Sequence, residues 1–360
     1  MLETKKRVKG YDIARAIAIF IMVFVNFNMV LTQIGDCGTL SKLLHIIQGK
    51  GAALFIVLAG AGMSMMVQTA LLDQDLPKLK KKKSVLFKRA IFLFVFGLIY
   101  LPLWPADILH YYGFYISIGS LLIAVRSIRL WILIGVIIVS YPFILIIIDY
   151  EIGWNWQTME YIGFWTLQGF FRNLLINGFH PVIPWVAFLL SGLWIGRQDM
   201  SNKNMRNLIL MISTSIFVFV QMSSQILIAT SELFAEFRFE DAIAVFGTNP
   251  MPPLPLYMIS SVSLSFVIIT LCIIFTEKFK NNLLVNVLMI TGQMAFTHYI
   301  THIVIGIYCI YIISGAHSVS SGFAFWYASI FCLVSVLFSW FWSKRFKKGP
   351  MSLFMRSITG

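Results

Sequence analysis

The stretch that decides the fold is residues 5–34, KKRVKGYDIARAIAIFIMVFVNFNMVLTQI. Its apolar part, from Ala16 to Ile34, contains neither proline nor glycine and is long enough for a helix to cross the roughly 30 Å hydrocarbon layer of a bilayer. The basic residues before it indicate a cytoplasmic lead-in at residues 1–14. We therefore expect a first transmembrane helix that enters the membrane from the cytoplasm.

Three polar residues interrupt this first span. Arg15 and Asn26 are eleven residues apart, about three helical turns, so both point to the same side of the helix. Asp12 lies three residues before Arg15 and can pair with it. Polar side chains inside a bilayer are costly, so this stripe is a candidate functional site. An interfacial ion pair plus an asparagine bonded to a neighbouring helix explains the spacing equally well.

The composition indicates a polytopic membrane protein. Hydrophobic residues make up 59% of the 360 residues and charged residues only 12%, which is too few to coat a soluble globule. We expect an all-α integral membrane protein, a bundle of about ten transmembrane helices that forms a single domain over residues 1–360. The candidate spans lie at 16–34, 51–70, 90–104, 108–125, 130–148, 182–196, 207–230, 255–276, 291–313 and 322–342. Small residues at 59–62 in the second span should allow a neighbouring helix to approach closely.

The basic residues gather on one side of this arrangement. With the N-terminus inside, most of the 28 lysines and arginines fall in cytoplasmic loops, including the run at 80–83 and a basic tail at 343–360. The outer loops carry most of the acidic residues. This pattern follows the positive-inside rule, so both termini should be cytoplasmic. The net charge of +13 then reflects topology and contact with anionic lipids, and we expect no nucleic-acid partner.

Several other classes of protein and site are disfavoured. The N-terminal residues lack a cleavable signal, because the first apolar run already has the length of a span, so we expect them to be retained. Three of the four cysteines lie in apolar runs and only Cys37 lies in a loop, which predicts no disulfide and no metal site. No Walker, dinucleotide-binding or serine-hydrolase motif is present, which argues against an ATP-driven pump.

The first span resembles the first helix of the transmembrane acyltransferase superfamily that includes heparan-α-glucosaminide N-acetyltransferase and the bacterial YeiB-type proteins. That helix has the pattern Asp-x-x-Arg-Gly-x-Ala, with an asparagine eleven residues after the arginine, and here Ala16 replaces the glycine. Four further stretches resemble the same proteins: GKGAALFIVLAGAGM (49–63), FKRAIFLFVFGLIYLPLWPADILHYYGFYISIG (87–119), FHPVIPWVAFLLSGLWIGR (179–197) and TGQMAFTHYITHIVIG (291–306).

The resemblance implies acyl transfer from cytoplasmic acyl-CoA, most simply acetyl-CoA. Such a reaction needs a base or a transient acyl carrier, and a donor for the developing oxyanion. The resemblance puts the reactive histidine in the first outer loop, where His45 matches best. It implies that Asn26 donates to the thioester carbonyl or fixes the reacting groups. Arg15, oriented by Asp12, would bind the phosphates of the coenzyme. Further candidates for binding this anionic donor are Lys88 and Arg89.

Other histidines remain open for the same chemistry. His180 lies just outside the sixth span and His302 lies in the ninth, so both are catalytic candidates beside His45. Asp107 and His110, three residues apart at the outer mouth, are candidate acceptor-binding residues, although Asp107 as a plain helix cap is an equally good explanation. His302 and His298 share a helix face, but no acidic or cysteine ligand accompanies them, so an interhelical contact explains them better than a metal.

The longest outer segment, residues 150–181, is rich in tryptophan and tyrosine. An aromatic belt at the membrane surface is the ordinary explanation. A platform on which sugar rings stack is the sharper hypothesis.

Together these features predict a membrane acyltransferase that moves an acyl group from acyl-CoA to a hydroxyl or amine of an extracytoplasmic glycan or other envelope molecule. We expect it in a bacterial cytoplasmic membrane, and the sequence leaves a homodimer open. A secondary transporter or flippase fits ten spans equally well, but discontinuous helices and inverted repeats would be expected. An inert envelope scaffold is the third possibility, in which the polar stripe packs against another helix without a cavity.

Overall fold

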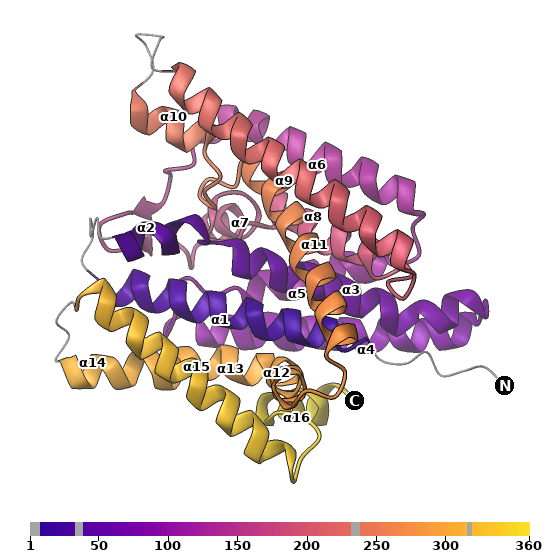
Figure 1. Cartoon of the computed structure of the whole chain (residues 1–360). Helices are drawn as coiled ribbons and strands as arrows, with labels where there is room; N and C mark the ends of the chain where they lie inside the picture. Colours follow the sequence, from indigo (N-terminus) through magenta and orange to yellow (C-terminus); the bar gives the residue numbers. More distant parts are fainter. Residues whose placement is uncertain (1–7, 33–38, 232–237, 315–318) are drawn as a thin grey trace. The chain divides into compact units, whose positions relative to one another are not determined.

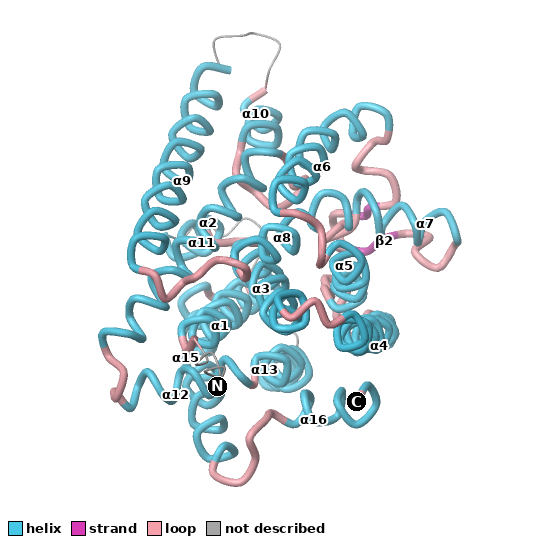
Figure 2. The backbone as a smooth tube through the Cα atoms, turned by 90° about the vertical axis from the view of Figure 1, so that its right-hand side faces the viewer, coloured by secondary structure: helices cyan, strands magenta, loops and turns pink. Residues whose placement is uncertain are grey.

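The computed structural model describes residues 8–32, 39–231, 238–314 and 319–360. These residues form helices and one two-stranded hairpin (Figure 1, Figure 2). The elements of the first half are α1 (Gly10–Leu31), α2 (Thr39–Ile46), α3 (Lys50–Leu72), α4 (Leu76–Tyr100), α5 (Leu109–Leu122), α6 (Ser127–Ile147), β1 (Trp154–Asn155), β2 (Glu160–Tyr161), α7 (Leu167–Arg172) and the π-helical η1 (Asn173–Asn177). Those of the second half are α8 (Val182–Ile195), α9 (Lys203–Ser231), α10 (Phe239–Phe246), α11 (Pro255–Lys278), α12 (Leu283–Gln293), α13 (Ala295–Thr301), the π-helical η2 (His302–Ile307), α14 (Tyr308–Ser314), α15 (Ser321–Ser343) and α16 (Pro350–Thr359).

The prediction of an all-α membrane protein is confirmed. By length and composition, six helical stretches of the described residues are able to cross a membrane, and eight if each of two bent pairs is one span. The bent pairs are Leu167–Asn177 with Val182–Ile195, at 47°, and Leu283–Gln293 with Ala295–Ile310, at 67°. Helices also lie at the two remaining predicted positions, but α4 is rich in lysine and α5 has only 14 residues. The count of ten and the cytoplasmic termini therefore stay predictions.

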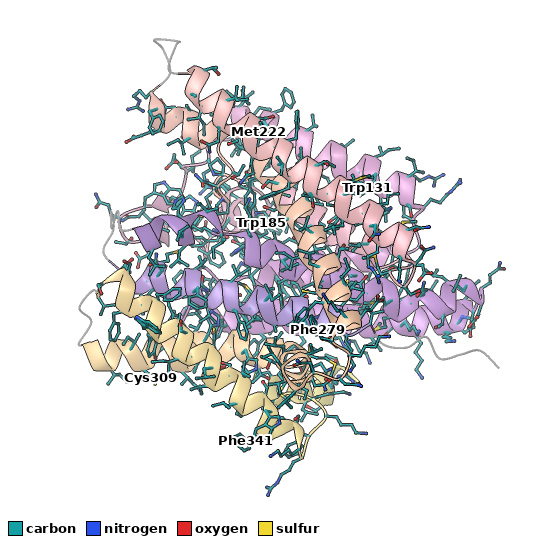
Figure 3. All side chains as sticks on the ribbon, viewed as in Figure 1. Trp131, Trp185, Met222, Phe279, Cys309 and Phe341 are labelled. Atoms are coloured by element: carbon teal, nitrogen blue, oxygen red, sulfur yellow. The ribbon has the colours of Figure 1, made fainter. Side chains whose placement is uncertain are left out.

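The long helices expose large apolar side chains. Ile147 of α6, Phe219 of α9 and Trp326 of α15 are 84%, 70% and 68% exposed. Met222 and Phe341, labelled in Figure 3, are exposed in the same way. Soluble proteins rarely expose apolar surface on this scale, whereas helix faces in contact with lipid do.

The described chain divides into two compact units. Unit 1 comprises residues 1–55, 200–211 and 265–356, and unit 2 comprises residues 56–199, 212–264 and 357–360. In unit 1, α1 packs against α12 and α15. Gly292 of α12 lies so close to the backbone carbonyl of Asp12 in α1 that a Cβ there would overlap it. The single domain expected from the sequence stays a prediction.

Unit 2 is built around two helix pairs, α4 with α5 and α6 with α8. Gly60 of α3 packs against the backbone of Leu189 and Gly192 in α8, and neither glycine has room for a Cβ. This close approach confirms what the small residues at 59–62 predicted. The hairpin pairs Trp154 with Tyr161, and it belongs to the aromatic segment that precedes α8.

Local sequence signals explain where several helices begin. The carboxylate of Asp75 accepts a hydrogen bond from the backbone N–H of Lys78 at 2.8 Å, which caps α4. Asn282 caps α12 in the same way through the N–H of Leu284, also at 2.8 Å. Of the cysteines, Cys272, Cys309 and Cys332 are free thiols, and Cys37 lies outside the described residues.

Candidate functional site

The polar stripe of α1 contacts α12 in unit 1. Asp12 is 1% exposed, and its carboxylate accepts hydrogen bonds from Arg15 and, at 3.3 Å, from Nε2 of Gln293. The Arg15 side chain is 24% exposed. A buried carboxylate therefore fixes a guanidinium that is still partly accessible. Its contact with coenzyme phosphates stays a prediction.

Further along α1, Asn26 meets a histidine that is distant in sequence. Its amide Nδ2 lies 3.0 Å from Nε2 of His302, across 276 residues of chain. His302 is 1% exposed and is the first residue of the π-helical η2. Phe27 stacks beside the imidazole with a centroid separation of 6.4 Å. Single π-helical turns occur often at functional sites, and this one begins at the residue that contacts the α1 stripe.

The hydrogen bonds of His302 define its tautomer. Nδ1 bonds the backbone carbonyl of Tyr299, and a carbonyl oxygen can only accept, so Nδ1 carries the proton. Nε2 is then unprotonated and accepts an N–H of Asn26. The pair thus presents a neutral imidazole with a basic nitrogen and an amide with a second N–H.

Two other histidines of unit 1 lie in different surroundings. His45 is exposed on the short helix α2. His298 is buried, and its Nε2 lies 2.7 Å from Oγ of Ser339 in α15. The expected interhelical contacts of His298 and His302 are therefore confirmed. Among the described residues, no group of three or more histidine, cysteine or acidic side chains is arranged to hold a metal.

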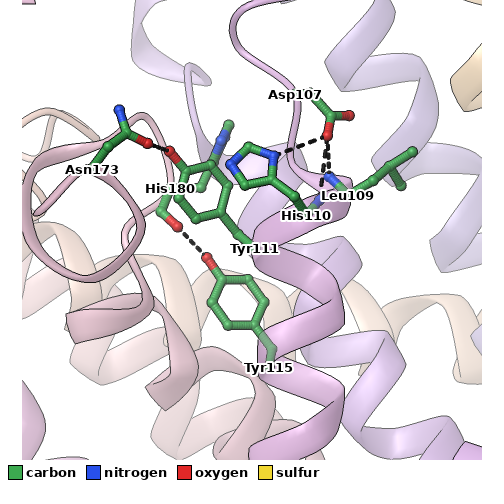
Figure 4. Close-up of polar contacts among 7 residues, drawn as sticks. All are labelled: Asp107, Leu109, His110, Tyr111, Tyr115, Asn173 and His180. Carbon is green, nitrogen blue, oxygen red and sulfur yellow. Dashed lines mark hydrogen bonds and ion pairs between the residues drawn. The ribbon is translucent and has the colours of Figure 1, made fainter. Parts of the chain in front are cut away.

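Unit 2 brings Asp107 and His110 together. Oδ2 of Asp107 accepts hydrogen bonds from the backbone N–H groups of Leu109, at 2.8 Å, and of His110, at 3.3 Å, so the capping explanation holds (Figure 4). The same oxygen lies 3.3 Å from Nδ1 of His110. Both side chains are at most 1% exposed, and Nε2 of His110 has no hydrogen-bond partner in the described chain. Asp107 therefore both caps α5 and orients an imidazole.

His180 lies on the other side of the Tyr111 ring in the same cluster (Figure 4). Its imidazole packs edge-on against Trp185 at 4.6 Å, and its backbone carbonyl accepts the hydroxyl of Tyr115. The hydroxyl of Tyr111 donates to Oδ1 of Asn173. His180 thus belongs to the Asp107–His110 cluster and is a member of unit 2, whereas His302 and Asn26 belong to unit 1.

Lys88 and Arg89 lie on α4, also in unit 2. Lys88 is exposed and Arg89 is half-buried. Their contact with an anionic donor stays a prediction.

Sequence reasoning missed three polar residues of these sites: the half-buried Gln293 and the buried Asn173 and Asn177. Each lies close to a helix break, Gln293 at the end of α12 and the two asparagines in the π-helical η1. A signal was present, since the asparagines of RNLLIN are four residues apart in an apolar run. It was overlooked because the whole segment was assigned to an outer loop.

Comparison with protein families extends this picture. Residues 7–231, more than half of the chain, match the family model described as heparan-alpha-glucosaminide N-acetyltransferase, catalytic. The chain belongs to this acetyltransferase family. Residues 253–360 match a second model, described as a protein of unknown function (DUF418). Among curated proteins, none matches the chain.

The family matches place the two halves of the candidate site in different matched regions. In this acetyltransferase family member, Asn26 lies in the catalytic match and His302 in the second match. Their hydrogen bond therefore joins the two regions in space. It also places the imidazole of His302 beside Asn26, the asparagine of the first-span pattern that resembles the family.

Proposed function

We propose that this protein transfers an acyl group, most simply acetyl, from cytoplasmic acyl-CoA to a hydroxyl or amine of an extracytoplasmic glycan or envelope molecule. The observation that carries the proposal is the Asn26–His302 hydrogen bond on the helix that also carries Asp12 and Arg15. Membership of an acetyltransferase family supports the reaction class. A bacterial cytoplasmic membrane is the location that fits such an acceptor.

In this proposal the two ends of the α1 stripe serve different parts of the donor. Arg15, held by Asp12, binds coenzyme phosphates near the cytoplasmic end. Asn26 donates its second N–H to the thioester carbonyl oxygen, where negative charge develops in the transition state. Lys88, Arg89, Asp107 and His110 remain candidates for contacts with donor and acceptor.

His302 is the base that the geometry favours. Nε2 has one lone pair, which the Asn26 N–H occupies at rest, so that N–H must leave before Nε2 accepts the proton of the acceptor hydroxyl or amine. The acceptor then bonds to the acyl carbon, the carbon–sulfur bond breaks, and the coenzyme leaves as a thiolate that takes the proton from His302. His45 and His180 remain alternatives, but His45 is exposed and His180 lies with Tyr111 and Trp185 in unit 2.

The test is turnover of the purified protein with labelled acetyl-CoA, scored by release of coenzyme A. His302→Ala should lower turnover by about 10²–10⁴, the usual contribution of a positioned proton-transfer group, while binding of acetyl-CoA persists. His298→Ala is the matched control, because it removes a buried imidazole one helical turn away that contacts Ser339 and Phe338 of α15. Equal losses in the two variants would refute the assignment of His302. If His45→Ala or His180→Ala abolished turnover while His302→Ala kept it, the role of the base would be assigned to His45 or His180 instead.

A secondary transporter or flippase is the second candidate, because two helices are bent at breaks. Broken helices that line substrate sites are common in such proteins. This candidate predicts substrate movement across sealed vesicles without release of coenzyme A. Coenzyme release coupled to acceptor acylation would exclude it.

A further inference from the structure

A cavity of about 280 Å³ lies in unit 2 beside the β1–β2 hairpin. It belongs to the aromatic segment of the sequence, and its walls include the rings of six residues: Tyr111, Trp154, Tyr161, Phe164, Trp165 and Phe179. Nothing in the acyl-transfer proposal uses it. Concave sites of this kind, apolar with a few fixed polar groups, are where small ligands bind.

The cavity is held open by a buried asparagine. Asn177 is fully buried, and its Nδ2 donates to the backbone carbonyls of Tyr150 and Ile152 at 2.9 and 2.8 Å. Its Oδ1 accepts the hydroxyl of Tyr161 at 2.8 Å, and its backbone carbonyl accepts the indole N–H of Trp154 at 2.7 Å. Through its side chain and its backbone carbonyl, this one residue ties both strands of the hairpin to η1, so the aromatic walls are preorganised.

Three pairs of these rings stand nearly at right angles. The interplanar angle is 85° between Trp154 and Tyr161, 79° between Trp154 and Phe179, and 86° between Phe164 and Trp165. Perpendicular rings offer both faces and edges to a ligand. The face of an aromatic ring carries partial negative charge and attracts cations.

The charge of the cavity also favours a cation. Among the described residues that line it, Glu160 alone is charged, and its carboxylate forms no ion pair within the described chain. Asp149 and Glu151 add negative charge in the preceding turn. The nearby guanidinium of Arg172 already bonds Tyr161, with Nε 2.8 Å from the hydroxyl and Cζ 5.7 Å from the ring centroid.

The floor of the cavity offers one hydrogen-bond donor. Asn173 is 3% exposed and lines the cavity. Its Oδ1 accepts the Tyr111 hydroxyl, while its Nδ2 has no hydrogen-bond partner among the described residues (Figure 4). This amide N–H can donate to an acceptor oxygen on a ligand.

We propose that the cavity binds a substituted ammonium group with an oxygen acceptor a few bonds away, the chemistry of choline and of choline-type head groups. The rings of Trp154, Trp165 and Phe164 surround the cation, and Glu160 balances its charge. Asn173 donates to the ligand oxygen. A neutral sugar ring, the hypothesis from the sequence, would use the same rings but would not need the unpaired carboxylate.

The experiment compares two isosteric probes on the full-length protein in a choline-free detergent. Choline and its uncharged analogue 3,3-dimethyl-1-butanol differ in charge but hardly in shape. Titration followed by calorimetry should show saturable binding of choline and weaker binding of the analogue, by about five- to thirtyfold. Equal affinity for the two probes, no binding of choline, or displacement of choline by glucose would overturn the proposal.

Variants identify the site. Glu160→Gln should weaken the binding of choline by about the same factor and leave the affinity for the neutral analogue unchanged. Glu240→Gln, which changes another exposed carboxylate, is the matched control and should not affect choline binding. Trp165→Ala should weaken choline, and Trp326→Ala should not. Unchanged choline affinity in both Glu160→Gln and Trp165→Ala would exclude this cavity.

Dihexanoyl phosphatidylcholine, compared with free choline, then distinguishes a lipid head group from a free ligand. None of these variants alters the Asn26–His302 pair, so a failure of the acyl-transfer proposal leaves this test intact.

Discussion

Replacing Asn26 by alanine separates the structural role of its hydrogen bond from a catalytic one. The change removes the 3.0 Å contact with Nε2 of His302. Because His302 is 1% exposed and its Nδ1 is already bonded to Tyr299, Nε2 is left buried without a partner. Such a loss costs about 1–3 kcal/mol in the free energy of unfolding. Asn26→Ala should therefore lower the thermal midpoint of the protein in detergent.

The kinetic effect is separate from this loss of stability. If the second N–H of Asn26 stabilises the developing oxyanion, kcat falls by about 10²–10³, or 2.7–4 kcal/mol in the activation barrier. An interaction made only in the transition state leaves the KM for acetyl-CoA unchanged. The assay is release of coenzyme A from labelled acetyl-CoA, measured at a temperature well below the lowered midpoint.

A double-mutant cycle with His302→Ala completes the test. Residues that act as one unit are non-additive, so the double variant should be hardly slower than the slower single variant. Asn28→Ala, two residues further along α1, is the control of matched type. A destabilised Asn26→Ala protein that keeps kcat within about threefold of wild type would show that the contact only holds α1 against η2.

Three further predictions use other parts of the chain. Arg15→Ala should weaken acetyl-CoA by about ten- to a hundredfold, since it removes a charge-assisted contact of about 1.5–3 kcal/mol; equilibrium binding with an unchanged affinity would remove Arg15 from the donor site. A reporter fused after Gly360 should be cytoplasmic, and tags within 150–181 should be reached by impermeant reagents from outside. The opposite pattern would overturn the predicted membrane topology. Gly60→Ala should lower the thermal midpoint because its Cβ overlaps the backbone of α8, whereas Gly135→Ala, with open space around it, should not; similar midpoints would contradict the packing.

The sequence predicted the features that depend on local periodicity. The stripe of Asp12, Arg15 and Asn26 follows from helical spacing within one apolar run, and α1 carries all three. The close approach at Gly60 follows from a cluster of small residues. Both signals lie within a few turns of one helix.

Features that depend on distant contacts or on backbone breaks could not be predicted. The partner of Asn26 is 276 residues away, and nothing in the spacing of His298 and His302 says which of them faces α1. Tertiary contacts decide this, because His302 meets Asn26 of α1 whereas His298 bonds Ser339 of α15. Asn177 was missed for a related reason: its importance lies in hydrogen bonds to Trp154 and Tyr161 of the hairpin and to Tyr150 before it, which the composition of the segment does not reveal.

The length of the α1 stripe has a consequence for the choice of donor. Arg15 and Asn26 are separated by about 16 Å of helix rise. If one end holds the phosphates and the other the thioester, then the flexible arm of the donor must extend over that distance. Short thioesters that lack the phosphate-bearing end would reach Asn26 without the anchoring charge, and the free nucleotide part would bind without presenting an acyl group. A rigid α-helix would thus select the coenzyme by its extended length as well as by its charge.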